Sequence, residues 1–174
     1  GRFQALLADF HEPLVETIKG FHNMRWRFTQ WDESVARNAA GRVDSCLAEI
    51  DWIESRRKEM LDFATLIENG TIPCRVTHND TKISNILFDA KTKEVLCMID
   101  LDTVMSATVL NDVGDALRCY TNTGAEDAQD LSTVSMSLEM FTAYIRGYLS
   151  EMGPSLCPAE LDYLAFSGRY ITFE

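Results

Sequence analysis

Apolar residues recur at helical spacing along two long stretches of the chain, which predicts a mostly helical fold. The first stretch predicts a helix over about 41–69, ended by Asn69 and Gly70. Its apolar stripe consists of Val43, Leu47, Ile50, Ile53, Met60, Ala64 and Ile67. The second stretch predicts a helix over about 126–152, with a stripe of Leu131, Val134, Leu138, Phe141, Ile145 and Leu149. Shorter helices are expected over 3–10, over 111–120 and from Pro158 onward, and Pro13 is expected near the start of a further short segment.

Short β segments are expected between these helices. Three apolar runs, 74–77, 85–88 and 94–99, are typical of strands, and the polar residues 89–93 predict a turn between the last two. Residues 20–31 hold four aromatic side chains and two arginines, and we expect a loop that folds onto the domain surface. The expected fold class is therefore α+β and mostly helical, with a small β insertion.

The composition indicates a folded domain and argues against nucleic-acid and membrane binding. The chain has 174 residues, 46% of them apolar, which suits one domain with a buried core and argues against disorder. The net charge of −11 argues against a nucleic-acid partner and against adhesion to an anionic membrane. No apolar run approaches the roughly 20 residues that span a bilayer. Since no signal peptide is recognisable either, we expect a cytoplasmic protein.

The cysteines indicate neither a disulfide framework nor a zinc site, because their number is odd and no C-x-x-C motif occurs. They are Cys46, Cys74, Cys97, Cys119 and Cys157. Reduced thiols within the core are expected, especially for Cys74 and Cys97, which lie in the strand-like runs.

One polar stretch carries the clearest chemistry. His78, Asp80 and Asn85 fit H-x-D-x-x-x-x-N, the catalytic-loop spacing of enzymes that move a phosphoryl group from ATP to a hydroxyl. Asp80 is the candidate base for the acceptor hydroxyl. Asn85 and Asp100 are candidate ligands of Mg²⁺, because this cation prefers oxygen ligands. Asp100 follows an apolar run, where a carboxylate buried without a partner would be costly.

Each of these residues also has a simpler interpretation. Asp80 could be a solvated loop residue, Asn85 a turn cap, and Asp100 a helix cap or half of a salt bridge. Lys82 could neutralise charge on the transferred phosphoryl group, or it could be an ordinary exposed lysine. His78 is grouped with the catalytic residues, although we expect it to orient the loop rather than to transfer a proton.

Several flanking residues have predicted supporting roles. Asp102 could lie close to the metal ion. Asp112 is expected to open a helix and to hold the loop through backbone N–H groups. Asp115 is expected to pair with Arg118 one turn later, on the helix surface. His11 and His22 are expected to be ordinary surface or loop histidines.

A second motif overlaps this region. Residues 98–104 also fit the D-x-D-x-[TV] signature of haloacid-dehalogenase-type phosphatases, with Asp100 as covalent nucleophile and Asp102 as acid/base. That signature normally opens a doubly wound domain, whereas the residues after Asp100 predict helices without alternating strands. It also leaves His78, Asp80 and Asn85 without a role.

The run from His78 to Asn85, followed by 95–102, resembles the aminoglycoside phosphotransferase and choline kinase family of small-molecule kinases. Within it, a wider set of segments is similar to the N-acetylhexosamine 1-kinase-like branch, namely 3–10, 21–23, 76–85, 97–105, 111–118 and 125–127. The resemblance implies a protein-kinase-like C-terminal lobe. In it Asp80 would be the catalytic base, Asn85 and Asp100 the metal ligands, and Asp112 a structural aspartate.

The resemblance further implies an enzyme that uses ATP and Mg²⁺ to phosphorylate a small molecule, most simply a sugar such as an N-acetylhexosamine. Because the chain has no Gly-rich phosphate loop and no strand-borne lysine, we expect residues 1–174 to be the C-terminal lobe. An N-terminal ATP-binding lobe would then precede Gly1, and the piece alone would be inactive. Ser106 and Ala107 stand where the branch usually has Pro-Gly, so the turn after Asp102 is expected to differ. The alternative is a non-catalytic binding protein with a kinase-like lobe; no oligomeric state is predicted.

Overall fold

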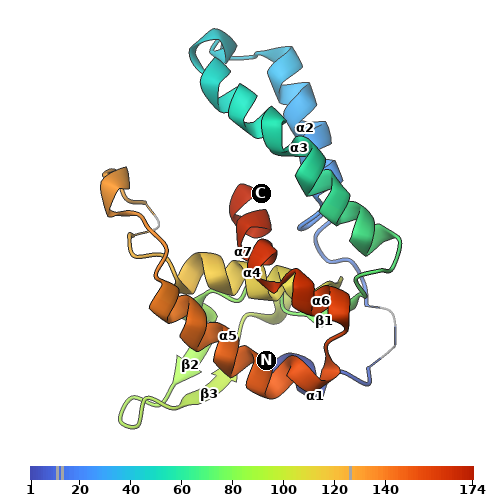
Figure 1. The fold of residues 1–174 in the computed structure, drawn as a ribbon, viewed down its shortest axis with the longest axis vertical. Helices are drawn as coiled ribbons and strands as arrows, with labels where there is room; N and C mark the ends of the chain where they lie inside the picture. The colour runs from blue at the N-terminus through green and yellow to red at the C-terminus, as the bar shows by residue number, and fades with distance from the viewer. Residues whose placement is uncertain (11, 13, 126) are drawn as a thin grey trace.

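The computed structural model describes residues 1–174 apart from positions 11, 13 and 126, so the expectations for His11, for Pro13 and for a helix beginning at Glu126 lie outside the described residues. The helices are α1 (Arg2–Leu6), α2 (Met24–Arg37), α3 (Leu47–Glu68), α4 (Val109–Tyr120), α5 (Leu138–Met152), α6 (Pro158–Asp162) and α7 (Leu164–Phe173). The strands are β1 (Arg75–Thr77), β2 (Ile86–Phe88), β3 (Val95–Met98) and β4 (Met105–Ala107). The predicted fold class is confirmed: the chain is mostly helical, with a small β part in the middle of the sequence (Figure 1).

The strands form two small antiparallel sheets, β1 with β4 and β2 with β3. The three predicted strands correspond to β1, β2 and β3. Strand β4 has no counterpart among the predicted strands, because its sequence, Met-Ser-Ala, contains no β-branched or aromatic residue. It pairs Met105 with Thr77, so the candidate catalytic loop begins at the end of this sheet.

Residues 24–37 form helix α2, so the loop predicted over 20–31 is wrong. Asn23 caps the helix, since its side-chain oxygen accepts a hydrogen bond from the backbone N–H of Trp26 at 3.0 Å. Met24 and Phe28 lie one turn apart and are both buried in the core. The aromatic stretch is therefore mainly an amphipathic helix that packs against the core.

The long helix predicted over 41–69 is confirmed as α3, which begins at Leu47 after a short 3₁₀ turn. Helices α2 and α3 run side by side and extend away from the rest of the molecule (Figure 1). Accordingly Met60, Phe63 and Ala64 are buried near the C-terminal end of α3, whereas Leu47 at its start is exposed. Among the described residues, no helix could cross a bilayer, α3 with its 22 residues included.

The helix predicted over 126–152 is shorter than expected. Helix α5 begins at Leu138, where the hydroxyl of Ser137 accepts a hydrogen bond from the backbone N–H of Met140 at 3.3 Å. Before it, Asp130 caps a short 3₁₀ turn at Leu131–Thr133. Leu131 is therefore exposed, and the apolar stripe packs against the core only from Phe141 onward.

Helix α4 lies at the centre of the fold and packs closely on α7 (Figure 1). All of its residues from Val109 to Leu117 are buried. The two helices approach closely at Gly114, where an added Cβ would lie 2.4 Å from the backbone oxygen of Ser167. Pro158 begins a helix as predicted, but this helix ends at Asp162 and α7 follows.

The prediction of core thiols is wrong. All five cysteines are free thiols, but Cys46, Cys74 and Cys97 are exposed and the other two are half-buried. Cys97 lies on β3, whose residues are exposed on both faces except at Met98. The apolar run that suggested a buried strand thus belongs to a solvent-exposed hairpin.

Candidate active site

The loop that follows β1 is held by a carboxylate of helix α4. Asp112 accepts hydrogen bonds from the backbone N–H groups of His78 at 3.0 Å and Asn79 at 2.6 Å. It is buried, and it also accepts a hydrogen bond from the side-chain amide of Gln4 at 2.7 Å. The loop-holding role predicted for Asp112 is confirmed. It does not open the helix, however, because Thr108 is the N-cap.

A second carboxylate, one turn further along α4, holds the other side of the loop. Asp115 accepts a hydrogen bond from the backbone N–H of Thr81 at 2.7 Å. Its predicted pair with Arg118 is present at 2.9 Å, although Asp115 is buried rather than on the helix surface. Residues three apart on a helix share a face. Asp112 and Asp115 therefore hold the loop on both sides of Asp80.

The side chain of Asp80 is partly exposed and lies beside two donors. The Nζ of Lys82 is 2.8 Å and the Nδ2 of Asn85 is 2.9 Å from its Oδ2 atom. Burial by itself would raise the pKa of Asp80, but the hydrogen bonds and charge of Lys82, together with Asn85, lower it. Asp80 is thus an ionised carboxylate at neutral pH, as a base must be.

His78 lies at the start of the loop, with its side chain in the protein interior. It is fully buried, and its Nε2 lies 3.0 Å from the backbone oxygen of Ile99. Its Nδ1 accepts a hydrogen bond from the backbone N–H of Asp80 at 3.3 Å. Both ring nitrogens of His78 therefore have a backbone partner, which fixes the orientation of the ring.

The predicted metal ligands Asn85 and Asp100 lie at the same end of the β2–β3 hairpin. The backbone N–H of Ile99, the residue before Asp100, donates to the backbone oxygen of Asn85 at 2.9 Å. The side-chain amide of Asn85 donates hydrogen bonds to the backbone and carboxylate oxygens of Asp80. The Oδ1 atom of Asn85 makes no hydrogen bond to any of the described residues. Asp100 is exposed and adopts left-handed backbone angles, with φ 63°.

This donor set fits Mg²⁺. One amide oxygen and one carboxylate are hard ligands, and Mg²⁺ commonly binds few protein groups together with substrate phosphates. No cluster of three or more His, Cys, Asp or Glu side chains suited to a metal ion occurs in the described part of the chain. Asp102 follows Asp100 in a 3₁₀ turn, and its backbone oxygen accepts a hydrogen bond from Thr17 at 2.9 Å. Its role as a metal ligand stays a prediction.

His22 is not the ordinary surface histidine that we expected. Its side chain is 13% exposed, and its Nε2 lies 3.0 Å from the backbone oxygen of Asn79. Its Nδ1 lies 2.6 Å from a carboxylate oxygen of Glu174, whose other oxygen accepts a hydrogen bond from Arg27 at 2.8 Å. A residue just before α2 and one just after α7 thus meet at the loop.

A cavity of about 460 Å³ adjoins Asp80. Its lining is dominated by charged side chains and consists of Phe21, His22, Arg27, Asn79, Asp80, Asp115, Arg118, Ile171 and Glu174. The acidic groups in it are paired with basic ones: Glu174 with Arg27 and Asp115 with Arg118. The base candidate therefore faces a polar space large enough for a small hydroxylated molecule.

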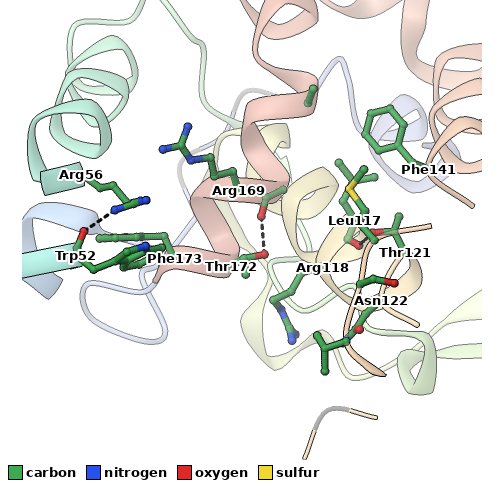
Figure 2. A pocket seen from close by; sticks show the side chains of 15 residues that line it. Trp52, Arg56, Leu117, Arg118, Thr121, Asn122, Phe141, Arg169, Thr172 and Phe173 are labelled. Atoms are coloured by element: carbon green, nitrogen blue, oxygen red, sulfur yellow. Dashed lines mark hydrogen bonds between the residues drawn. The ribbon is translucent and has the colours of Figure 1, made fainter. Parts of the chain in front are cut away.

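A larger cavity, of about 530 Å³, also has Arg118 in its lining. Figure 2 shows Trp52, Arg56 and Phe173 grouped at one side of it, with Leu117, Thr121 and Asn122 at the other. Its lining is mostly apolar and includes none of the candidate catalytic residues. Despite its greater size, this cavity is therefore not the candidate phosphoryl-transfer site. Arg118 lines both cavities, so the larger one adjoins the polar one.

Gln4, His22 and Glu174 contribute to the site without any local signal in the sequence. Gln4 and Asp112 are 108 residues apart, and His22 and Glu174 are 152 apart, so no spacing rule connects them. The one available indication was that segments 3–10 and 21–23 resemble the same family as the catalytic loop.

A family model described as "Phosphotransferase enzyme family" matches residues 1–149. The match spans most of the chain and includes α4 and the whole candidate loop. The phosphatase alternative needs a parallel, doubly wound sheet, whereas β1–β4 and β2–β3 pair antiparallel. Phosphotransferases of the kinase-like kind generally use ATP and Mg²⁺. The chain belongs to the phosphotransferase enzyme family, whose members are kinase-like phosphotransferases.

Proposed function

We propose that this protein transfers the γ-phosphate of ATP to a hydroxyl of a small molecule, and that the acceptor is a sugar such as an N-acetylhexosamine. The observation that carries the proposal is the position of Asp80. Its carboxylate lines the 460 Å³ cavity while accepting a hydrogen bond from Asn85 at 2.9 Å. A base for the acceptor and a candidate ligand for Mg²⁺ are therefore side by side.

The roles of the side chains follow from this geometry. When bound, ATP with Mg²⁺ supplies the phosphoryl group and the cation that stabilises its charge. Asp80 orients the acceptor hydroxyl by accepting its hydrogen bond. It takes the proton as the hydroxyl oxygen bonds to the γ-phosphorus and the bond from that phosphorus to the departing ADP breaks. Lys82, whose Nζ is 2.8 Å from the Asp80 carboxylate, neutralises negative charge at the same place. Asn85 and Asp100 would hold the metal ion, with Asp102 as a further ligand.

The charge pattern of the cavity favours a neutral acceptor over a cationic one. Each of its carboxylates already has a cationic partner: Asp80 has Lys82, Asp115 has Arg118, and Glu174 has Arg27 and His22. A choline or a polycationic aminoglycoside would need carboxylates without such partners. A sugar instead needs many hydrogen-bonding groups of both kinds, which paired charges provide.

We also propose that the Gly-rich loop and the lysine that hold ATP lie outside residues 1–174, because the sequence contains neither. Residues 1–174 would then be the acceptor-binding and catalytic lobe, inactive alone. The experiment should therefore use the full-length protein. ATP consumption is measured with a panel of N-acetylhexosamines, other sugars, choline, homoserine and aminoglycosides.

We expect turnover with a sugar, and we expect Asp80→Asn to lower kcat by about 100- to 10,000-fold without loss of folding. Asp62→Asn is the matched control, because Asp62 forms an exposed pair with Lys58 on α3. Full activity of Asp80→Asn would contradict the base assignment. If no acceptor in the panel stimulates ATP consumption, the protein is instead a non-catalytic binding protein, and the proposed function is wrong.

A further inference from the structure

The peptide group between Asn79 and Asp80 is held at both ends by histidines. His22 reaches its oxygen at 3.0 Å, and Nδ1 of His78 accepts a hydrogen bond from its N–H at 3.3 Å. A peptide group is planar, so contacts at its oxygen and its nitrogen fix the orientation of the whole unit. The Cα atom of Asp80 belongs to this unit, and its position is therefore set in part by His22.

The hydrogen-bond partners of His22 define its charge. One ring nitrogen faces a backbone oxygen and the other faces the Glu174 carboxylate, and both of these groups only accept hydrogen bonds. Both nitrogens must carry a proton for both contacts to form. Arg27 binds the second carboxylate oxygen of Glu174 and keeps that side chain ionised and in place.

We propose that His22, as a doubly protonated imidazolium oriented by Glu174, is a positioning residue that holds the Asn79–Asp80 peptide and so places the Asp80 carboxylate. Its catalytic consequence rests on the proposed phosphotransferase function, whereas the protonation state of the ring does not. Asn79 adopts a left-handed conformation with φ 64°, which is uncommon for a residue other than glycine. Such a conformation persists only where surrounding contacts fix it, and the contact from His22 is one of these.

The surroundings of the ring support this charge. Glu174, just after α7, and Asp115 on α4 are the acidic groups that act on it, and Asp80 lines the same cavity. Arg27 and Arg118 are the basic groups that line this cavity. Burial by itself would lower the pKa of His22, but the hydrogen bond and charge of Glu174, with the backbone of Asn79, raise it. The ring thus keeps its second proton at a higher pH than an exposed histidine does.

Loss of one proton should break the contact with the loop. The carboxylate of Glu174 is a stronger acceptor than a backbone oxygen, so the remaining proton stays on Nδ1. The lone pair on Nε2 would then face the oxygen of Asn79 and repel it. In the full-length enzyme, kcat should therefore fall as the pH rises through the pKa of His22.

Glu174→Gln should reverse this pH response. Arg27 donates to the Oε1 position and thereby keeps an oxygen there, so the amide nitrogen of the new side chain faces Nδ1 of His22. A neutral ring can then accept from that amide and still donate from Nε2 to Asn79. In this variant we expect kcat to be maintained at alkaline pH and to fall when the ring is protonated at acidic pH.

Activity provides the first set of tests on the full-length protein. His22→Gln should lower kcat by about 100-fold, with KM for ATP and acceptor changed little, because a misplaced base slows the chemical step rather than binding. Arg25→Gln is the matched control on α2, since Arg25 pairs with Glu68 away from the loop. It should leave kcat and the pH profile unchanged. Equal kcat for His22→Gln and wild type, or the same pH profile for Glu174→Gln and wild type, would overturn the positioning role.

The second test does not depend on enzymatic activity. In ¹⁵N-histidine-labelled full-length protein, His22 is assigned by the signal missing from His22→Gln. At pH 7, where a histidine of ordinary pKa near 6.5 is mainly neutral, both ring nitrogens of His22 should show the chemical shift of an imidazolium. In uniformly ¹⁵N-labelled full-length protein, the backbone amide of Asp80 should also shift as His22 titrates. A neutral ring at pH 7 would overturn the proposal even if the protein is a kinase, and an imidazolium would support it even if no acceptor is found.

Discussion

The carboxylate of Asp112 lies 2.6 Å from the backbone nitrogen of Asn79, the residue just before the candidate base. The loop is therefore anchored to helix α4 by hydrogen bonds and is not held only by the strand that precedes it. Helix α4 is buried from Val109 to Leu117 and packs on α7, so its position is fixed by the core. The loop bound to α4 is therefore held in a fixed position as well. A catalytic carboxylate placed in this way can face solvent without being mobile.

Asp112→Asn should destabilise the fold. An amide can replace only one of the two carboxylate oxygens that accept from His78 and Asn79, so one buried backbone N–H loses its partner. We expect the free energy of unfolding to fall by about 1–3 kcal/mol, measured by denaturant titration. Asp62→Asn, which changes an exposed pair, should alter it by no more than about 0.5 kcal/mol. Equal stability of the two variants would show that Asp112 does not hold the loop.

Lys82→Met should impair catalysis more than folding. Methionine retains most of the side-chain length but removes the ammonium that lies 2.8 Å from Asp80. The side chain is 44% exposed, so stability should change little, whereas kcat should fall by about 100-fold. Steady-state kinetics of the full-length protein test this, with Lys58→Met on α3 as the control. A raised KM with unchanged kcat would instead mean that Lys82 contributes only to ground-state binding.

Two glycine-to-alanine changes should have opposite effects on stability. At Gly114 a Cβ would lie 2.4 Å from the backbone oxygen of Ser167, so Gly114→Ala must separate α4 from α7. A loss of about 1–3 kcal/mol or more is expected. At Gly147, on α5, no atom lies within 4 Å of the added Cβ, and Gly147→Ala should stabilise by about 0.5–1 kcal/mol. Thermal unfolding of both variants distinguishes these outcomes. A tolerated alanine at position 114 would contradict the close helix contact.

The ion pair of His22 and Glu174 should stabilise the fold only within a limited pH range. Burial opposes the charge on each group, but their hydrogen bond and attraction raise the pKa of His22 above 6.5 and lower that of Glu174 below 4.5. The contribution of His22 is complete below pH 6.5 and is lost as the pH rises through its folded pKa. That of Glu174 is complete above pH 4.5 and is lost as the pH falls through its folded pKa.

The difference in unfolding free energy between wild type and His22→Gln should therefore be largest between pH 4.5 and 6.5 and should decline on both sides. Denaturant titrations across this range measure it. The exposed pair of Arg25 and Glu68 offers a comparison, because Arg25→Gln should change stability little at any pH in this window. A difference that is constant with pH would mean that the two side chains are not charged partners.

Predictions from the sequence were best where the interactions are local. Strands β1, β2 and β3 and the pair of Asp115 with Arg118 depend on residues close together in the sequence, and all of them were predicted. The same holds for α3, whose apolar stripe is regular. Helices α2 and α5 differ from the predicted loop and the predicted longer helix because of their N-caps. The side-chain hydrogen bonds of Asn23 and Ser137 determine where each helix begins.

The sequence by itself determined the helical character of the chain, the strands of the hairpin and the identity of the candidate catalytic groups, because periodicity and motif spacing act over a few residues. Only the tertiary structure decided that Gln4 binds the Asp112 carboxylate, and that His22 contacts the loop with Glu174 as its partner. Contacts between residues more than a hundred positions apart leave no period in a sequence. They form only when α1, α2, α4 and α7 pack around one core, which brings these side chains to the same carbonyl and amide groups.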